Sequence, residues 1–132
     1  MAFRRAIERD DDSVEAHDGL GIVLRRSGRN EDAVYEHMRA AALQHLRPQT
    51  HLNLGIALAN SHQFDWAIRA FSLAAEMQPD LPLPHRWLAM IYRRVKKDRT
   101  KAREHIRIFV QLRRAVVERT AKNPVVATES PA

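Results

Sequence analysis

The sequence predicts an all-helical protein built from a repeated pair of helices. Its 132 residues include only four glycines and six prolines, and the abundant Ala, Leu, Arg and Glu favour helices over strands. When residues 14–47 are laid over residues 48–81 without a gap, ten positions are identical, where ordinary composition supplies about two or three. Within each copy, apolar residues recur at three- and four-residue spacing on either side of a polar break. A single domain of stacked helices is therefore expected.

The repeat has three copies. The identities between the first two are His17/His51, Leu20/Leu54, Gly21/Gly55, Ile22/Ile56, Leu24/Leu58, Ser27/Ser61, Ala33/Ala67, Ala40/Ala74, Ala41/Ala75 and Gln44/Gln78. A third copy begins near Pro82, and after one inserted residue its second half places Ala102 and Ile106 opposite Ala67 and Phe71. The polar breaks at 27–30, 60–63 and 96–98 predict the turn inside each copy. Pro48, Pro79, Pro82 and Pro84 fall between copies, where a missing amide donor is tolerated.

These copies resemble the tetratricopeptide repeat, whose unit of about 34 residues carries W-x-x-L-G-x-x-Y, then A-x-x-x-F, then P. The second copy reads HLNLGIAL, AIRAF and Pro79, the first HDGLGIVL and AVYEH, and the third HRWLAMIY and AREHI. Gly or Ala at positions 21, 55 and 89 would let the paired helices approach closely. The resemblance implies a right-handed α-solenoid of antiparallel helix pairs over residues 1–119, with repeats at 14–47, 48–81 and 82–119.

Both ends of the chain depart from whole repeats. Phe3 and Ala6 match Phe71 and Ala74 in register, so residues 2–11 are interpreted as a half repeat without its first helix. We favour a fragment of a longer array over a lone capping helix, and uncovered ends make a homo-oligomer a reasonable expectation. The last helix is expected over residues 99–119. Residues 120–132 lack periodicity and contain two prolines, which indicates a disordered tail or a linker.

The family geometry implies that the first helix of each copy lines a concave groove that binds a peptide or helix of a partner protein. The register places Glu15 and Asp18 on this face of the first copy. The predicted partner-binding residues are Ile22, Arg25, Arg26, Leu52, Asn53, Ile56, Asn60, Arg86, Trp87, Met90, Arg93 and Arg94. An apolar floor with an arginine rim suits a partner that has apolar anchors and acidic flanks. In the alternative interpretation, Trp87 and Met90 simply pack against a neighbouring helix.

One known variant of the family clamps the C-terminal carboxylate of heat-shock chaperones with Lys, Asn and Arg side chains. Only Asn53 fits that pattern here, and Asp18 would repel a carboxylate. Binding of a chaperone tail is therefore not expected.

The sequence offers no signal for a metal, a cofactor or catalysis. Cysteine is absent, and the GLG at 19–21 lies within a helical register, not in the strand-to-helix turn of a dinucleotide site. His17, His51 and His85 recur at one position, but first helices about 10 Å apart cannot bring them within about 2.1 Å of one zinc ion. We expect packing roles for these histidines and no enzymatic activity, although the unit could be the docking module of a larger enzyme.

Charge supports a rival function. The net charge is +6, yet residues 86–122 alone contain thirteen Lys or Arg against Asp98, Glu104 and Glu118. The alternative interpretation is a basic nucleic-acid-binding module. The segment, however, has too few aromatic residues for a continuous base-stacking platform. A solvated helical face would explain the charges equally well. No secretory signal or apolar run of about 20 residues is present, so a cytoplasmic location is expected.

Overall fold

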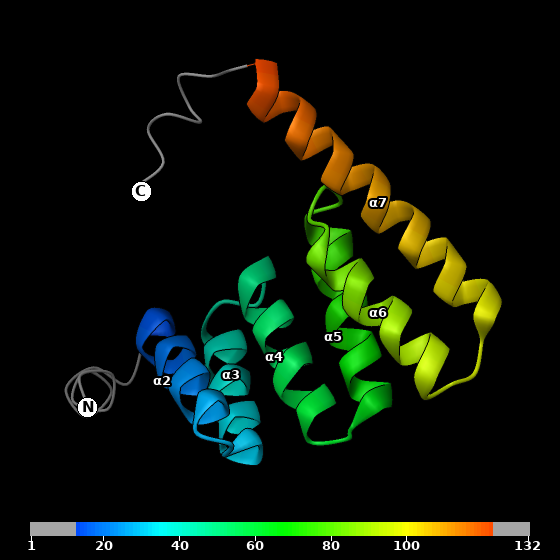
Figure 1. Ribbon diagram of the computed structural model, residues 1–132. Coiled ribbons are helices and arrows are strands. Elements are labelled where there is room, and N and C mark those ends of the chain that lie inside the picture. The colour runs from blue at the N-terminus through cyan, green and yellow to red at the C-terminus, as the bar shows by residue number, and fades with distance from the viewer. Residues whose placement is uncertain (1–12, 123–132) are drawn as a thin grey trace. The chain divides into compact units, whose positions relative to one another are not determined.

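The computed structural model describes residues 13–122, and these residues fold into helices joined by turns (Figure 1). The helices are α2 (Val14–Arg26), α3 (Asn30–Leu43), α4 (Pro48–Asn60), α5 (Phe64–Met77), α6 (Leu83–Arg94) and α7 (Arg99–Lys122). No strand occurs within the described range, so the predicted all-helical class is confirmed. The half repeat predicted at 2–11 lies outside the described residues, as does the tail beyond Lys122. The last helix continues three residues past its predicted end at Arg119.

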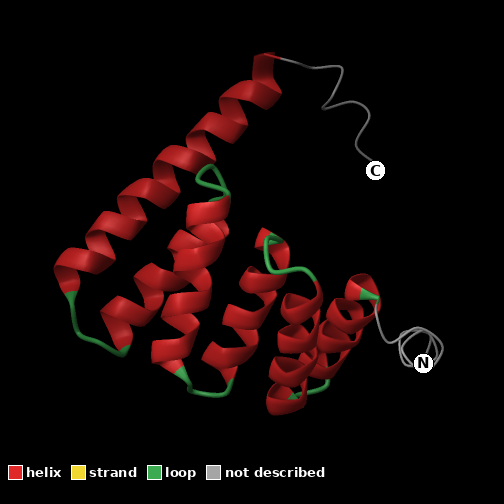
Figure 2. Ribbon diagram, turned by 180° about the vertical axis from the view of Figure 1, so that it is seen from behind, coloured by secondary structure: helices red, strands yellow, loops and turns green. Residues whose placement is uncertain are grey.

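The chain divides after Pro79 into two compact units. Unit 1 contains α2 to α5, and unit 2 contains α6 and α7. In unit 1, α2 packs on α3 and α4 packs on α5, while α4 also contacts α3 and α2. In unit 2, α6 packs on α7. Both views show the two helices of each pair running in opposite directions, joined by a short turn (Figures 1 and 2). These are the pairs that the sequence repeat predicts.

The helix starts have local causes in the sequence. The Ser13 hydroxyl accepts a hydrogen bond from the amide of Ala16 (3.1 Å) and caps α2, while Pro48 occupies the first turn of α4, where an amide donor has no helical partner. At the start of α7, the Asp98 carboxylate accepts from the amide of Lys101 (3.0 Å). Asp98 lies in the polar break predicted for the third copy, and Ser13 and Pro48 lie where the first and second copies begin.

Each first helix ends in the same way. Gly28, His62 and Lys97 have positive φ angles of 82°, 60° and 56°. The chain reverses there, and an amide after the helix bonds back into its last turn: Arg29 to the Leu24 carbonyl (2.8 Å) and Gln63 to the Leu58 carbonyl (2.9 Å). A residue in the left-handed backbone conformation commonly ends a helix, and glycine adopts this conformation without steric cost. The repeat therefore extends to the backbone of the turns.

The helix pairs of unit 1 approach closely at the two glycines. A Cβ atom on Gly21 would lie 2.5 Å from the His37 ring, and one on Gly55 would lie 2.7 Å from the Phe71 ring. Both rings are fully buried. In the third copy, Ala89 stands at the glycine position and Ile106 at the ring position. The predicted close approach of the paired helices at positions 21 and 55 is thus confirmed.

Candidate functional site

The predicted partner-binding residues of unit 1 differ in their accessibility. Arg26 and Asn60 are exposed, and Ile22 and Arg25 are half-buried on α2. By contrast, Leu52, Asn53 and Ile56 on α4 are buried, with exposed fractions of 3%, 5% and 8%. Buried side chains offer a partner little surface. The role of these unit 1 residues stays a prediction.

The predicted residues of unit 2 share one face of α6. Arg86, Trp87, Met90, Arg93 and Arg94 follow one another at helical spacing, so they form one stripe along the helix. Trp87 and Met90 are half-buried, and the three arginines are exposed. The buried side chains of α6 are Pro84, Leu88, Ala89 and Ile91. The stripe is therefore distinct from the face of α6 that forms the core of unit 2, and we call it the α6 face.

A basic cleft lies where the end of α6 meets the beginning of α7. Its volume is about 1030 Å³, and two of its lining residues, Ala102 and Ile106, are apolar. The other lining residues are all cationic: Arg93, Arg94, Lys97, Arg99, Arg103 and Arg107. None of the described residues that line the cleft is acidic, so its positive charges are not neutralised from within. We refer to it as the basic cleft.

Arg93 and Arg94 are among the predicted partner-binding residues, whereas the residues that α7 contributes to the cleft were not predicted. The signal was present, because Arg99, Arg103 and Arg107 recur every four residues and so project from one face of a helix. The missing information was which face of α7 packs on α6. The excess of Lys and Arg showed that residues 86–122 are basic, but not where these side chains lie in the folded chain.

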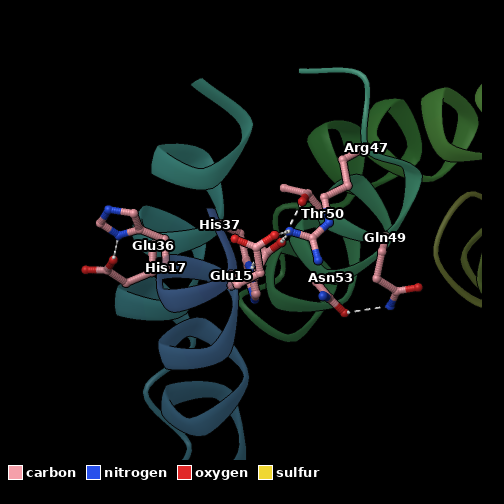
Figure 3. Close-up of polar contacts among 9 residues, drawn as sticks. Glu15, His17, Glu36, His37, Arg47, Gln49, Thr50 and Asn53 are labelled. Carbon is pink, nitrogen blue, oxygen red and sulfur yellow. Dashed lines mark hydrogen bonds and ion pairs between the residues drawn. The ribbon is translucent and has the colours of Figure 1, made fainter. Parts of the chain in front are cut away.

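A buried polar network links three helices of unit 1 (Figure 3). One Asp18 oxygen lies 2.8 Å from His37 Nδ1, and the other accepts a hydrogen bond from the Thr50 hydroxyl (2.5 Å). Arg47 Nη1 lies 3.7 Å from Asp18 and also 3.7 Å from Glu15. Asp18 was predicted to face the groove, but it is only 5% exposed, because α4 packs on α2 and α3 and covers it. Like Leu52, Asn53 and Ile56, Asp18 offers a partner little surface, and its place on the binding face stays a prediction.

The network contains an aspartate, a histidine and a hydroxyl, but its geometry does not support nucleophilic catalysis. The Thr50 hydroxyl donates to Asp18, whereas an activated nucleophile donates to the histidine base. His37 and Thr50 are fully buried, so a substrate has no access to either of them. The arrangement satisfies buried polar groups and fastens α2, α3 and α4 to one another.

The recurring histidine has a different partner in each copy. His17 Nδ1 lies 2.7 Å from a Glu36 carboxylate oxygen, and His85 Nδ1 lies 3.0 Å from His105 Nδ1. Glu36 and His105 occupy equivalent repeat positions. The second copy has Ala70 there, and His51 instead hydrogen-bonds the His45 carbonyl through Nε2 (2.6 Å). Within residues 13–122, no group of three or more His, Asp or Glu side chains could hold a metal ion.

The His85–His105 pair should make unit 2 sensitive to acid. A hydrogen bond between two ring nitrogens needs one of them to accept, so at least one ring is neutral. Burial lowers the pKa of His85, and the nearby His105 lowers it further. Burial also lowers the pKa of His105, opposed by Glu104 and assisted by Lys101. The ring of His105 is also stacked on Tyr92, at 5.6 Å between centroids.

We expect unit 2 to lose stability on acidification. The folded-state pKa values of both histidines lie below that of a free histidine, about 6.5. The unfolded chain therefore binds more protons, and stability falls as the pH drops through about 6.5 towards the lowered folded values. Thermal unfolding followed by Trp87 fluorescence in a Trp66→Phe background, between about pH 8 and about pH 5, measures this loss.

His105→Glu provides the matched comparison, because it places a carboxylate where Glu36 stands beside His17. The variant should retain more of its stability in acid than the background chain. The other histidines are common to both proteins and cancel in the difference. Equal loss of stability in the two proteins would show that the pair does not cause the acid sensitivity.

Each helix within residues 13–122 is too short or too polar to span a lipid bilayer. No protein-family model matches the chain, and neither does any curated protein. Among solved structures, the chain is similar to a crystal structure of MamA, with a TM-score of 0.83 and 19% identity over 88% of this chain and 67% of that one. The structure of MamA MSR-1 gives a TM-score of 0.76 and 24% identity over 86% and 65% of the two chains.

A further crystal structure of MamA protein gives a TM-score of 0.78 and 20% identity, and it covers 98% of this chain and 66% of that one. The chain thus spans about two thirds of the length of these three structures. Identities this low establish the fold alone. With the helix pairs described above, the likeness confirms the predicted fold class, an α-solenoid of antiparallel helix pairs.

Proposed function

We propose that the chain is a protein-interaction scaffold of the tetratricopeptide-repeat family, whose first helices bind a peptide or helix of a partner protein. Three copies of the repeat pattern support the family, and the likeness to MamA structures supports the fold on which that family is built. Fold alone does not specify function, so the proposal depends on the surface that the helices present.

The α6 face is the observation that carries this proposal. Trp87 and Met90 provide apolar surface between exposed arginines at positions 86, 93 and 94. Tryptophan and arginine are the side chains most enriched among residues that dominate binding energy, and methionine adapts to partners of different shape. The partner expected for such a face has apolar anchors bordered by acidic residues.

Replacing Trp87 by Ala should weaken partner binding by about 2 kcal/mol or more, because a large side chain at the centre of an interface often dominates the affinity. The experiment compares the proteins captured from cell extract by the wild-type chain, by Trp87→Ala and by Trp66→Ala. Trp66 is the matched control, because it is the other tryptophan of the chain and is 59% exposed on α5. Circular dichroism checks that each variant keeps its helical content.

The expected result is a set of captured proteins that Trp87→Ala loses and Trp66→Ala retains. Equal capture by all three chains would remove the α6 face from the proposal. Loss with Trp66→Ala alone would move the binding surface to α5.

Three finer expectations also belong to this proposal. They are a partner of acidic character, self-association into a homo-oligomer, and a place in the cytoplasm. Self-association is supported by exposed apolar side chains of unit 1, among them Tyr35 and Leu46.

A further inference from the structure

Ile106 is exposed at a repeat position where both other copies are fully buried. The repeat aligns Ile106 with His37 and Phe71, which have exposed fractions of 0%, whereas Ile106 is 48% exposed. The residue one turn earlier, Ala102, aligns with Ala33 and Ala67 and is buried like them. The floor of the basic cleft thus includes the exposed side chain of Ile106, whereas the equivalent side chains of the other two copies are buried.

In the first copy, a helix covers this position. His37 bonds to Asp18, which accepts a hydrogen bond from Thr50 in the first turn of α4, and α4 packs on both α2 and α3. Within unit 2, the described residues supply no third helix of this kind. The basic cleft therefore lies on the α6–α7 pair at the position that α4 occupies on the α2–α3 pair.

The apolar surface continues along α7. Val110 lies four residues after Ile106, and Val117 lies seven residues after Val110; the two valines are 46% and 60% exposed. Together the three residues form a stripe about 16 Å long at a rise of 1.5 Å per residue. Helical spacing places Arg103, Arg107 and Arg114 along one side of this stripe and Arg113 along the other.

We propose that the basic cleft and the apolar stripe of α7 bind an acidic amphipathic helix of another protein. The apolar side of that helix would cover Ile106, Val110 and Val117. Its Asp and Glu residues would pair with the arginines on both sides, since guanidinium groups form two parallel hydrogen bonds with a carboxylate. The inference rests on the proposed function, to which it adds a surface and the chemistry of a partner.

A nucleic acid suits this surface less well than an acidic helix does. A phosphate backbone would engage the arginines but would gain nothing from burying Ile106 and the two valines. Stacking of bases also requires accessible aromatic rings, and neither the cleft nor the stripe contains one. The combination of an apolar centre with a cationic border matches a helix that is apolar on one side and acidic at its edges.

The probe is a fluorescein-labelled helical peptide with leucines at positions i, i+3, i+4 and i+7 and glutamates beside them. Three comparison probes isolate its features. A scrambled peptide of identical composition lacks the apolar side, a lysine-for-glutamate peptide reverses the charge, and a single-stranded oligonucleotide carries phosphates. Fluorescence anisotropy measures the affinity of the whole chain for each probe at low and at physiological salt.

Two variants test the two parts of the surface. Arg103→Glu/Arg107→Glu should weaken binding of the amphipathic peptide by about tenfold or more, because charge-assisted pairs turn into like-charge contacts. Ile106→Glu should weaken it to a similar degree, about tenfold, by placing a charge in the apolar centre. Arg119→Glu/Lys122→Glu is the control, because it makes the same charge change beyond the stripe on the same helix; its affinity should stay within about twofold of wild type.

The proposal requires the amphipathic acidic peptide to bind more tightly than all three comparison probes. Equal binding of the scrambled peptide would overturn the proposal, because it would show that the arginines attract any acidic peptide whether or not it has an apolar side. Tighter binding of the oligonucleotide, or equal effects of the test and control variants, would also overturn it. If this surface fails while capture still depends on Trp87, the inference is wrong and the proposed function stands; loss of both would reject the two together.

Discussion

Replacing Phe71 by Ala is expected to lower the free energy of unfolding of unit 1 by about 3–5 kcal/mol, the usual cost of deleting a buried aromatic ring. Phe71 is fully buried, and its ring lies against Gly55 at a distance that leaves no room for a Cβ atom on that glycine. The ring therefore fills the closest approach of α4 and α5. Its removal leaves a cavity that two rigid helices cannot easily close.

Urea unfolding followed by Trp66 fluorescence, in a Trp87→Phe background, measures this loss in unit 1. Met38→Ala is the control, because Met38 is 57% exposed and its truncation should change stability by only about 0.5 kcal/mol or less. A loss of less than about 1 kcal/mol for Phe71→Ala would mean that the α4–α5 pair does not depend on this contact.

Replacing Asp18 by Ala is expected to cost about 2–6 kcal/mol, because each of the two buried polar groups left without its hydrogen-bond partner costs about 1–3 kcal/mol. The change leaves the Thr50 hydroxyl and His37 Nδ1 without the carboxylate to which they bond. His37 Nε2 already has no hydrogen-bond partner, so the ring would lose its polar contact in a fully buried place. Asp18→Asn should cost less, since an amide oxygen can still accept one of the two bonds.

The repeat itself suggests a rescue. The second copy has Leu52 and Phe71 where the first has Asp18 and His37. Asp18→Leu/His37→Phe/Thr50→Val would replace the polar network with apolar packing of the kind that the second copy uses. Because a buried ionic group can often be exchanged for well-packed apolar residues at little cost, the triple variant should recover most of the stability that Asp18→Ala loses. A triple variant as unstable as Asp18→Ala would show that the two copies do not pack equivalently.

Much of the fold could be predicted from the sequence, because the repeat gives both the length of each helix pair and the helix on which each helix packs. Aligning Gly21 with Gly55 located the close approach of each pair, and the polar breaks located the turns to within one or two residues. These features are local: a small residue at a helix contact or a left-handed turn has the same consequence wherever it occurs. The continuation of α7 past Arg119 was less predictable, since residues 119–122 have no apolar periodicity.

The candidate sites were harder to predict because they depend on which helix faces which. Asp18 has the spacing of a surface residue on α2, and only the placement of Thr50 against it shows that it is buried. The same holds for Ile106, whose repeat position predicts burial although it is 48% exposed. A single sequence tells which side chains share a helix face, but the neighbour that covers that face is a property of the folded chain.

Hydrogen–deuterium exchange tests the proposed binding surface directly, with the chain measured alone and together with a protein that the wild type captures and Trp87→Ala loses. We expect slower exchange in α6 and in the first half of α7, where the α6 face and the basic cleft lie. Slower exchange restricted to α3 and α5, with α6 and α7 unchanged, would show that the partner binds elsewhere.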